Sequence, residues 1–459
     1  MLRPSLQYQS LKTVLLHTDA NTRFRISAHM PSIRDVEKVV PLKMSRFDIY
    51  PDRITVETDT EYKVGIVRHF TVDSDLSAVA PEQNLIWYSF DFDKFGFPFT
   101  AGKNVVLPGD VSFQLENRLE FRWDTKENER ELRETLTRYE KALKMQTELK
   151  SKGITVEDYL KSLGPVPGNV NEPAFEEETR MRRALTISSS LLSNFIGNYK
   201  LNLIPYDCRK NNTKPPFTFY IQLDITKGKS RQIQRFEYNK KLFEASKGLN
   251  EALFGRRKAP IQVGRLFLNA HSTIHRLPMG FRLHAKHVHT VDFNLTHASF
   301  RLLVENSERL ECIEMKYGGR GDAFQTETVR RAKRLVIHNV LISDMERLTQ
   351  IIRNLSNLEI TILDLSRTAE ETFNFIQAWL SANRPVGASC CIEVRDVKTA
   401  EKILTLVQTQ YERAHRNNRC VTIQKTESTR AEVFYVPFTP SRRYTQNIQW
   451  LLKSRIVNV

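Results

Sequence analysis

Histidine is the residue type in this chain whose spacing comes nearest to that of a metal site. Six of the eleven histidines lie between residues 271 and 297. They are His271, His275, His284, His287, His289 and His297. His271 and His275 are four residues apart, and His287 and His289 would share a strand face, so either pair could hold zinc. However, no cysteine lies among them and the chain has no His-Glu-x-x-His spacing. We therefore expect surface or half-buried histidines, with no metal and no cofactor.

The sequence also lacks nucleotide-binding and nucleophile motifs. Its one glycine cluster, Gly-Gly-Arg-Gly-Asp at residues 318–322, is not followed by the Lys-Ser or Lys-Thr of a phosphate loop, so we expect a flexible loop there. No Gly-x-Ser-x-Gly elbow occurs. Cys390 and Cys391 fall in a segment predicted to be a buried strand, where thiols are unreactive. We therefore expect a protein that is not an enzyme.

The charge of the chain is concentrated in one segment. Lys plus Arg number 69 against 53 Asp plus Glu, which gives a net charge of +16. Residues 201–290 alone hold 17 basic and 5 acidic residues, a difference of +12. Two basic clusters could add to this surface; they are Arg256, Arg257 and Lys258, and Arg330, Arg331, Lys333 and Arg334. Such a segment could contact nucleic-acid phosphates, or it could be an ordinary solvated face.

Cysteine usage and hydropathy suggest a compartment. The five cysteines are odd in number and scattered, which favours a reducing environment over a disulfide framework. No apolar run approaches the roughly 18 residues of a membrane span, and the first residues carry no apolar leader. We expect a cytoplasmic or nuclear protein without a membrane partner.

The first half of the chain changes its pattern twice. Residues 1–41 show helical periodicity, and residues 47–50, 53–57 and 61–67 alternate as short strands. Residues 125–152 contain no Gly or Pro and carry an apolar stripe at Leu132, Leu136, Tyr139 and Leu143, which predicts one long amphipathic helix packed on its own domain. Gly-Pro-Val-Pro-Gly at 164–168 then interrupts the chain.

The last 200 residues show a weak internal period. Strand-like apolar cores occur at residues 265–268, 290–293, 310–315, 335–337 and 360–365, in steps of 22 to 25 residues. This spacing is typical of leucine-rich-repeat-type units, and helices between the strands would make the strands parallel. The predicted fold class is α+β. The predicted limits are 1–41 for the N-terminal helices, 42–163 for a β-rich domain ending in the long helix, 164–180 for a linker, and 181–459 for a basic strand–helix domain.

Several composite stretches resemble one protein family over nearly the full length. These are residues 10–15, 19–23, 26–27, 31–33, 40–42, 62–66, 108–110, 206–212, 215–216, 221–223 and 253–257. They resemble the nematode-expanded F-box-associated family, called F-box C, with its domain of unknown function. The resemblance implies that the N-terminal helices are a divergent F-box that binds a Skp-type adaptor of a cullin-RING ubiquitin ligase. The residues that match this pattern are Leu6, Leu11, Val14, Leu15, Ile26, Pro31 and Ile33. From the residues alone, these helices could equally cap the first sheet.

Two classes of function follow as expectations. The first is non-catalytic protein recognition, as the substrate-receptor subunit of a ubiquitin ligase with a Skp-type adaptor and an acidic target as partners. The second is nucleic-acid binding through residues 201–290. A plain scaffold is a third reading of the same features.

Overall fold

The computed structural model describes residues 8–70, 87–99, 105–113, 123–166, 172–269, 274–290, 298–306, 309–316, 324–338, 345–363, 368–438 and 449–459. The N-terminal helices are α1 (Tyr8–His17), α2 (Ala20–His29), the 3₁₀ turn η1 (Pro31–Ile33) and α3 (Arg34–Val39). Asp19 caps α2 because its carboxylate accepts the Thr22 backbone N–H at 3.0 Å. The helical pattern predicted for residues 1–41 is thus present where the structure describes this segment.

One large mixed sheet joins segments that are far apart in the sequence. Its antiparallel part holds β1 (Lys43–Ile49), β2 (Arg53–Val56), β3 (Thr60–Phe70), β8 (Phe217–Lys227) and β9 (Ser230–Glu237), in that order. On its other side β1 pairs in parallel with β10 (Ile261–Leu268). The sheet therefore takes strands from both sides of the predicted linker at 164–180, and the domain limits themselves stay a prediction.

The next part of the sheet is parallel. After β10 come β12 (Leu283–Thr290), β13 (Cys312–Lys316), β14 (Arg334–His338), β15 (Glu359–Ile362) and β16 (Ser389–Val394), each parallel to its neighbour. Four antiparallel strands finish this end: β20 (Gln449–Asn458), β19 (Thr429–Phe438), β18 (Cys420–Gln424) and β17 (Ala414–Asn417). The α+β class is confirmed. Of the strand expected at 290–293, Thr290 is the last residue of β12, and residues 291–293 lie outside the described residues.

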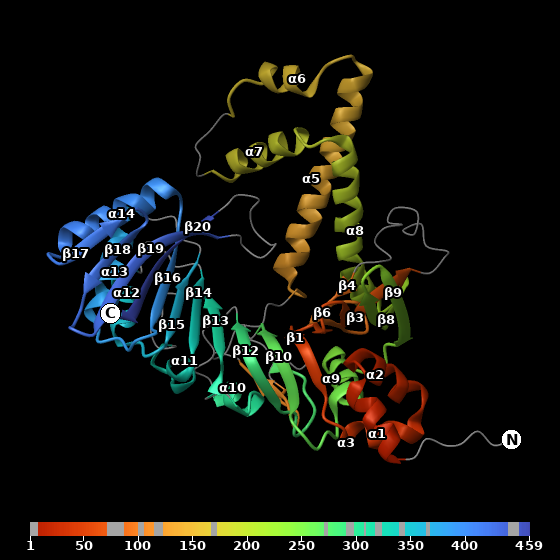
Figure 1. Cartoon of the computed structure of the whole chain (residues 1–459). Coiled ribbons are helices and arrows are strands. Elements are labelled where there is room, and N and C mark those ends of the chain that lie inside the picture. The colour runs from red at the N-terminus through yellow and green to blue at the C-terminus, as the bar shows by residue number, and fades with distance from the viewer. Residues whose placement is uncertain are drawn as a thin grey trace.

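Helices follow most of these strands along the chain. They are α9 (Leu242–Phe254), α10 (Ala298–Leu303), α11 (Glu327–Arg331), α12 (Met345–Asn354), α13 (Ala369–Ser381) and α14 (Val397–Gln410). Shorter strands are β4 (Trp87–Tyr88), β5 (Asp91–Phe92), β6 (Pro98–Phe99), β7 (Val111–Ser112) and β11 (Ile274–His275). Figure 1 shows α10 to α14 gathered along one side of the parallel strands.

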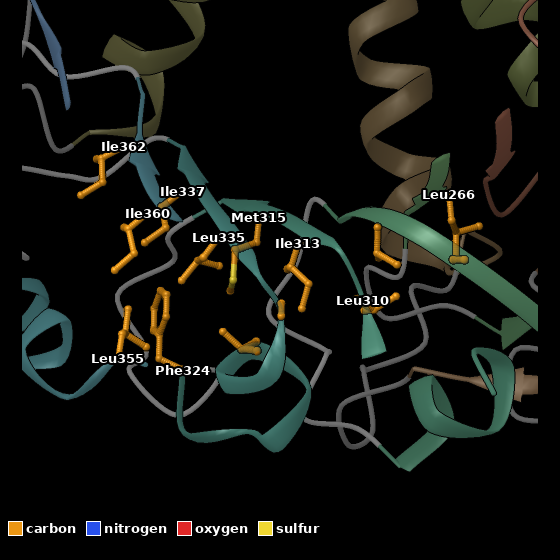
Figure 2. Close-up of a cluster of buried hydrophobic side chains, with 14 of the residues drawn as sticks. Leu266, Leu310, Ile313, Met315, Phe324, Leu335, Ile337, Leu355, Ile360 and Ile362 are labelled. Carbon is orange, nitrogen blue, oxygen red and sulfur yellow. The ribbon is translucent and has the colours of Figure 1, made fainter. Parts of the chain in front are cut away.

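The main core lies between these helices and the parallel strands. Leu266 of β10 is fully buried, and so are Ile313, Leu335 and Ile360 on the successive strands β13, β14 and β15. Figure 2 shows them in one cluster with Leu355 and Phe324. Burying each such side chain contributes about 1.5–3 kcal/mol. Since successive strand residues point to opposite faces, the side chains between these apolar residues must lie on the other face of the sheet.

A helical arm stands away from the sheet. It consists of α5 (Lys126–Ser151), α6 (Val156–Ser162), α7 (Pro173–Leu185) and α8 (Ser189–Asn211), with α5 and α8 side by side in Figure 1. The long helix predicted at 125–152 is confirmed, and its Tyr139 ring packs on Phe195 of α8. Within the stretch 164–180 that the sequence predicts as a linker, α7 begins at Pro173. A proline at the first helical position followed by alanine and glutamates favours this start.

Candidate functional site

The candidate site is the face of the parallel sheet opposite the apolar core. We call it the open face and define it by the outward side chains of Arg265, His287, His289, Glu314, Arg334, His338 and Glu359. In β13, for example, Ile313 and Met315 are fully buried whereas the Glu314 side chain between them is 22% exposed. The open face therefore presents polar and charged groups on a rigid hydrogen-bonded support.

Glu314 is the centre of an ionic cluster on this face. Its carboxylate lies 2.8 Å from the Arg265 guanidinium and 2.9 Å from Nε2 of His338, and Nδ1 of His289 is 3.7 Å away. The register explains this meeting, since His289 pairs directly with Glu314 across β12 and β13. Burial opposes ionisation of Glu314, but the His338 hydrogen bond and the His289 and Arg265 charges prevail and lower its pKa to about 2.

The two histidine rings of this cluster are stacked. Their centroids are 6.1 Å apart, and the His289 ring also meets the Phe267 ring edge-on at 5.0 Å. Burial lowers the pKa of His289, with the Glu314 charge acting in the opposite direction. This cluster can donate and accept hydrogen bonds and can present a ring edge, which are properties of a recognition surface.

The register across three neighbouring strands is continuous at the start of this face. Met44, Val263 and Ala285 pair across β1, β10 and β12, and so do Arg46, Arg265 and His287. The Arg265 and His287 side chains are therefore neighbours on adjacent strands. Gly264 is needed here, because an added Cβ would lie 2.6 Å from the Ser45 carbonyl oxygen.

Further along the sheet the charges alternate in sign. Arg334 on β14 lies 3.2 Å from Glu359 on β15, and Glu432 on β19 is 2.7 Å from Arg455 on β20. These pairs are directly opposed in the strand register. Opposite charges on adjacent strands contribute a few tenths of a kcal/mol to about 1 kcal/mol each, so they serve mainly to define a charge pattern.

Three cysteines of the parallel strands are shielded from solvent. Burial raises the pKa of the Cys312, Cys390 and Cys391 thiols, which keeps them protonated. Within the described ranges, no group of three or more His, Cys, Asp or Glu residues is placed to hold a metal ion. None of the helices that the structure describes is both long and apolar enough to cross a membrane.

The histidines identified from the sequence lie in different environments. His287 and His289 share the open face as predicted. His275 differs from the expectation of a half-exposed residue, because only 2% of it is accessible and burial lowers its pKa to about 4. His271 and His297 lie outside the described residues, so the spacing of His271 and His275 is not tested.

The N-terminal candidates fall into three groups. Leu15 is 1% exposed and belongs to the core, whereas Val14 is 51% exposed and Pro31 is also exposed. Leu11, Ile26 and Ile33 are partly buried, and Leu6 lies outside the described residues. Other exposed apolar side chains on these helices are Tyr8, Leu16 and Met30. Val14 and Leu16 are thus the apolar side chains of α1 with large exposure near its end.

A buried ionic cluster fixes these helices on the sheet. Arg23 of α2 lies 2.9 Å from Glu37 of α3, and Arg257, just after α9, lies 2.7 Å from the same carboxylate. Lys38 donates to the Leu253 carbonyl at the end of α9, at 2.8 Å, and burial lowers its pKa to about 8. Since these contacts join α2, α3 and α9, the N-terminal helices have one defined position.

The basic clusters named from the sequence are broken up by these contacts. Arg257 is buried against Glu37, with its side chain 5% exposed, while Arg256 and Lys258 are exposed. Arg331 pairs with Glu327, and Arg334 pairs with Glu359. Arg330 and Lys333 are exposed. The seven residues therefore do not form one uninterrupted stripe of free cations.

A groove at the far end of the arm is a second surface feature. It has a volume of about 1040 Å³ and lies between the end of α5, α6 and the turn from α7 to α8. Ile154, Leu160, Leu185 and Ile187 supply its apolar wall. Gln146 of α5 closes one side by donating to the Leu185 and Ile187 carbonyls.

Sequence reasoning missed Glu314, Arg265 and His338 as one cluster. The histidine-rich segment pointed to the right strand, but the partners come from β10, β13 and β14, which lie up to 73 residues apart along the chain. The register of the parallel strands was the missing information.

The comparisons with known proteins concern this same region. Residues 241–396 match a family model described as a domain of unknown function (DUF3557). The match covers about a third of the chain and contains all seven residues that define the open face. Neither the curated proteins nor the solved structures gave a match. The segment from α9 to β16 is thus similar to a family whose function is not known.

Proposed function

We propose that this chain is a non-catalytic recognition protein that binds a partner protein on the open face. The observation that carries the proposal is the open face itself, a rigid sheet surface on which arginine, histidine and glutamate side chains alternate in a fixed register. Paired charges of this kind favour one complementary surface over others. The net charge of +16 would steer an acidic partner toward the chain.

The finer form of the proposal is a substrate receptor of a cullin-RING ubiquitin ligase. In this form the N-terminal helices are F-box-like and bind a Skp-type adaptor, while the leucine-rich-repeat-like strand–helix array binds the target. Support comes from the resemblance of the sequence to the F-box C family and from the exposed apolar residues Val14 and Leu16 on α1. The buried Arg23–Glu37–Arg257 cluster would keep the adaptor and the target at a fixed separation.

The adaptor contact can be tested by capture with a purified Skp-type adaptor. We expect the full chain to capture the adaptor and Val14→Asp to abolish capture. Leu191→Asp is the matched control, because Leu191 is 50% exposed on α8 of the arm, as exposed as Val14. Leu15→Asp is not a useful test, since Leu15 lies in the core and its loss would unfold α1. If the wild-type chain captures no adaptor, the ligase form of the proposal fails.

The open face is tested separately by comparing co-purifying proteins. We expect the charge reversal Arg334→Glu, which breaks the pair with Glu359, to remove specific partners that the wild-type chain retains. Arg330→Glu is the control, because Arg330 is exposed on α11 next to the same strand. An unchanged set of partners for both variants would contradict recognition through the open face.

Nucleic-acid binding is the alternative function, and it can be tested with the same purified chain. It predicts an affinity for duplex DNA or RNA that falls steeply with salt and is lost on reversing the charges of Arg256 and Lys258. These two cations are exposed, whereas Arg257 is buried with Glu37. Binding with this behaviour would move the assignment from protein to nucleic acid.

A further inference from the structure

Strand β9 forms an exposed edge of the large sheet. All eight of its residues, Ser230–Glu237, are exposed, and β8 is its only partner among the described strands. Two large apolar side chains lie on it, Ile233 at 42% and Phe236 at 49% exposure. A long edge strand of this kind offers unpaired backbone groups to another strand.

The backbone groups that face outward can be assigned from the hairpin. Lys227 pairs with Ser230 across the two-residue turn Gly228–Lys229, and Gly228 has a φ of +56°. The pair that closes a two-residue turn exchanges hydrogen bonds, and such pairs then alternate along the strands. Hence the N–H and C=O groups of Arg231, Ile233, Arg235 and Glu237 point away from β8. The Glu237 carbonyl accepts from Asn239 at 2.9 Å.

We propose that β9 pairs antiparallel with β9 of a second copy of this chain, with Gln234 on the two-fold axis. In this register Arg231 lies opposite Glu237 of the other copy, and Ile233 lies opposite Arg235. Both strands present the same outward residues, so the contact is isologous and closes as a dimer. The two Arg–Glu pairs lie on one face of the joined sheet.

Charge selects this register over its neighbours. Residues whose backbone groups point outward must pair with residues of the same kind. The nearest alternative registers are therefore shifted by two residues. One shift would place Arg231 opposite Arg235, and the other would place Arg235 opposite Arg235. Like charges directly opposite each other destabilise a strand pair, whereas opposite charges stabilise it. A shift of four residues would set Arg235 opposite Glu237, but it would pair far less of the strand. The full-length register is therefore the one in which the edge is complementary to itself, which argues for a second copy as its occupant.

The dimer is expected to be reversible. A stable interface buries about 1,600 Å² in total, and one eight-residue edge supplies less than that. Association should therefore depend on protein concentration.

Sedimentation velocity of the full chain over a range of concentrations tests the proposal. The 53.4 kDa chain should approach twice that mass as concentration rises. Glu237→Arg should remain monomeric, because it sets Arg against Arg231, and Arg231→Glu should do the same. Glu237 has no ion pair within the described residues, so its substitution leaves the monomer intact. Arg231→Glu also removes the ion pair with Asp224, so circular dichroism must show that this variant is folded.

An equimolar mixture of the two variants is the decisive sample. A heterodimer restores both opposite-charge pairs, so the mixture should dimerise although neither variant does so alone. Arg235→Glu should retain the dimer, because its opposite residue is Ile233. A wild-type chain that stays monomeric, a mixture that stays monomeric, or a dimer that survives Glu237→Arg would each overturn the proposal. Capture of an acidic extended peptide by a monomeric chain would assign the edge to another partner instead.

Discussion

The Arg23 guanidinium and the Glu37 carboxylate are buried together at 2.9 Å, with side chains 1% and 0% exposed. Arg23 also donates to the Val40 and Pro41 carbonyls, each at 2.8 Å, so one side chain holds α2 against both α3 and the chain that enters β1. The pair is therefore one of the links between the N-terminal helices and the sheet, beside the Asn21 contacts with Val56 and Tyr62.

Removing the carboxylate of this pair should be costly. Glu37→Gln leaves Arg23, Lys38 and Arg257 buried without their shared anion, so we expect the free energy of unfolding to fall by about 3–5 kcal/mol. Urea denaturation followed by circular dichroism measures the change. Asp35→Asn, at an exposed site on the same helix, should change stability by less than about 0.5 kcal/mol. Equal effects of the two substitutions would contradict the role of the buried cluster.

The close approach of β1 and β10 should leave no room for a side chain at Gly264. Gly264→Ala sets a Cβ 2.6 Å from the Ser45 carbonyl oxygen between two paired strands, and we expect a loss of about 1–3 kcal/mol. Gly248→Ala is the matched control. Gly248 lies inside α9 with no atom within 4 Å of the added Cβ, so the same change should stabilise by about 0.5–1 kcal/mol. Thermal unfolding of both variants measures these changes. We expect the melting temperature to fall for Gly264→Ala and to rise for Gly248→Ala.

The Glu314 cluster should make stability depend on acidic pH. The folded chain lowers the pKa of Glu314 to about 2 from an ordinary 4.5, so the stabilisation is fully present above pH 4.5 and is lost as pH falls toward 2. The full contribution is about 3 kcal/mol. We expect the stability difference between the wild type and Glu314→Gln to be large at pH 5–6 and to shrink toward pH 2. Glu311→Gln, at a side chain 56% exposed, should differ little from the wild type. A difference for Glu314→Gln that is constant with pH would refute the cluster.

The two neighbouring arginines after α9 should behave differently. Arg257 is buried on Glu37, so Arg257→Ala should lower stability by about 1–3 kcal/mol. Arg256 is exposed and has a φ of +60°, a region that costs non-glycine residues about 1–2 kcal/mol. Arg256→Gly should therefore leave stability unchanged or raise it. Chemical denaturation of the two variants measures both changes in stability. A loss of stability for Arg256→Gly would contradict the assignment of Arg256 as an exposed residue in an unfavourable backbone conformation.

Sequence patterns were sufficient wherever the determinants were local. The stretch from Thr125 to Lys152 has no helix breaker and an apolar stripe, and α5 begins and ends within one residue of the prediction. The repeated strand–helix alternation after residue 260 also gave the parallel pairing correctly. The limits of the linker at 164–180 stay a prediction, although helix α7 already begins at Pro173.

The open face could not be predicted from local sequence patterns, because it depends on which strands pair and in which register. His289 and Glu314 meet because β12 and β13 pair in one register, and a slip of a single residue would turn one of them into the core. Arg257 looked like a surface cation among Arg256 and Lys258, and only the position of α3 shows that it faces Glu37. Charge counts along a sequence cannot separate these two environments.

The parallel pairing of β1 with β10 also has a consequence for biosynthesis. Ile49 leaves the ribosome more than 200 residues before Ile261, so at 5–20 residues per second β1 waits on the order of 10–40 s for its neighbour. During that time the nascent β1–β2–β3 meander exposes a hydrogen-bonding side that another chain could capture. Such long-range closure folds slowly, and recombinant yield should therefore improve with slower, cooler expression or with a chaperone that covers this segment.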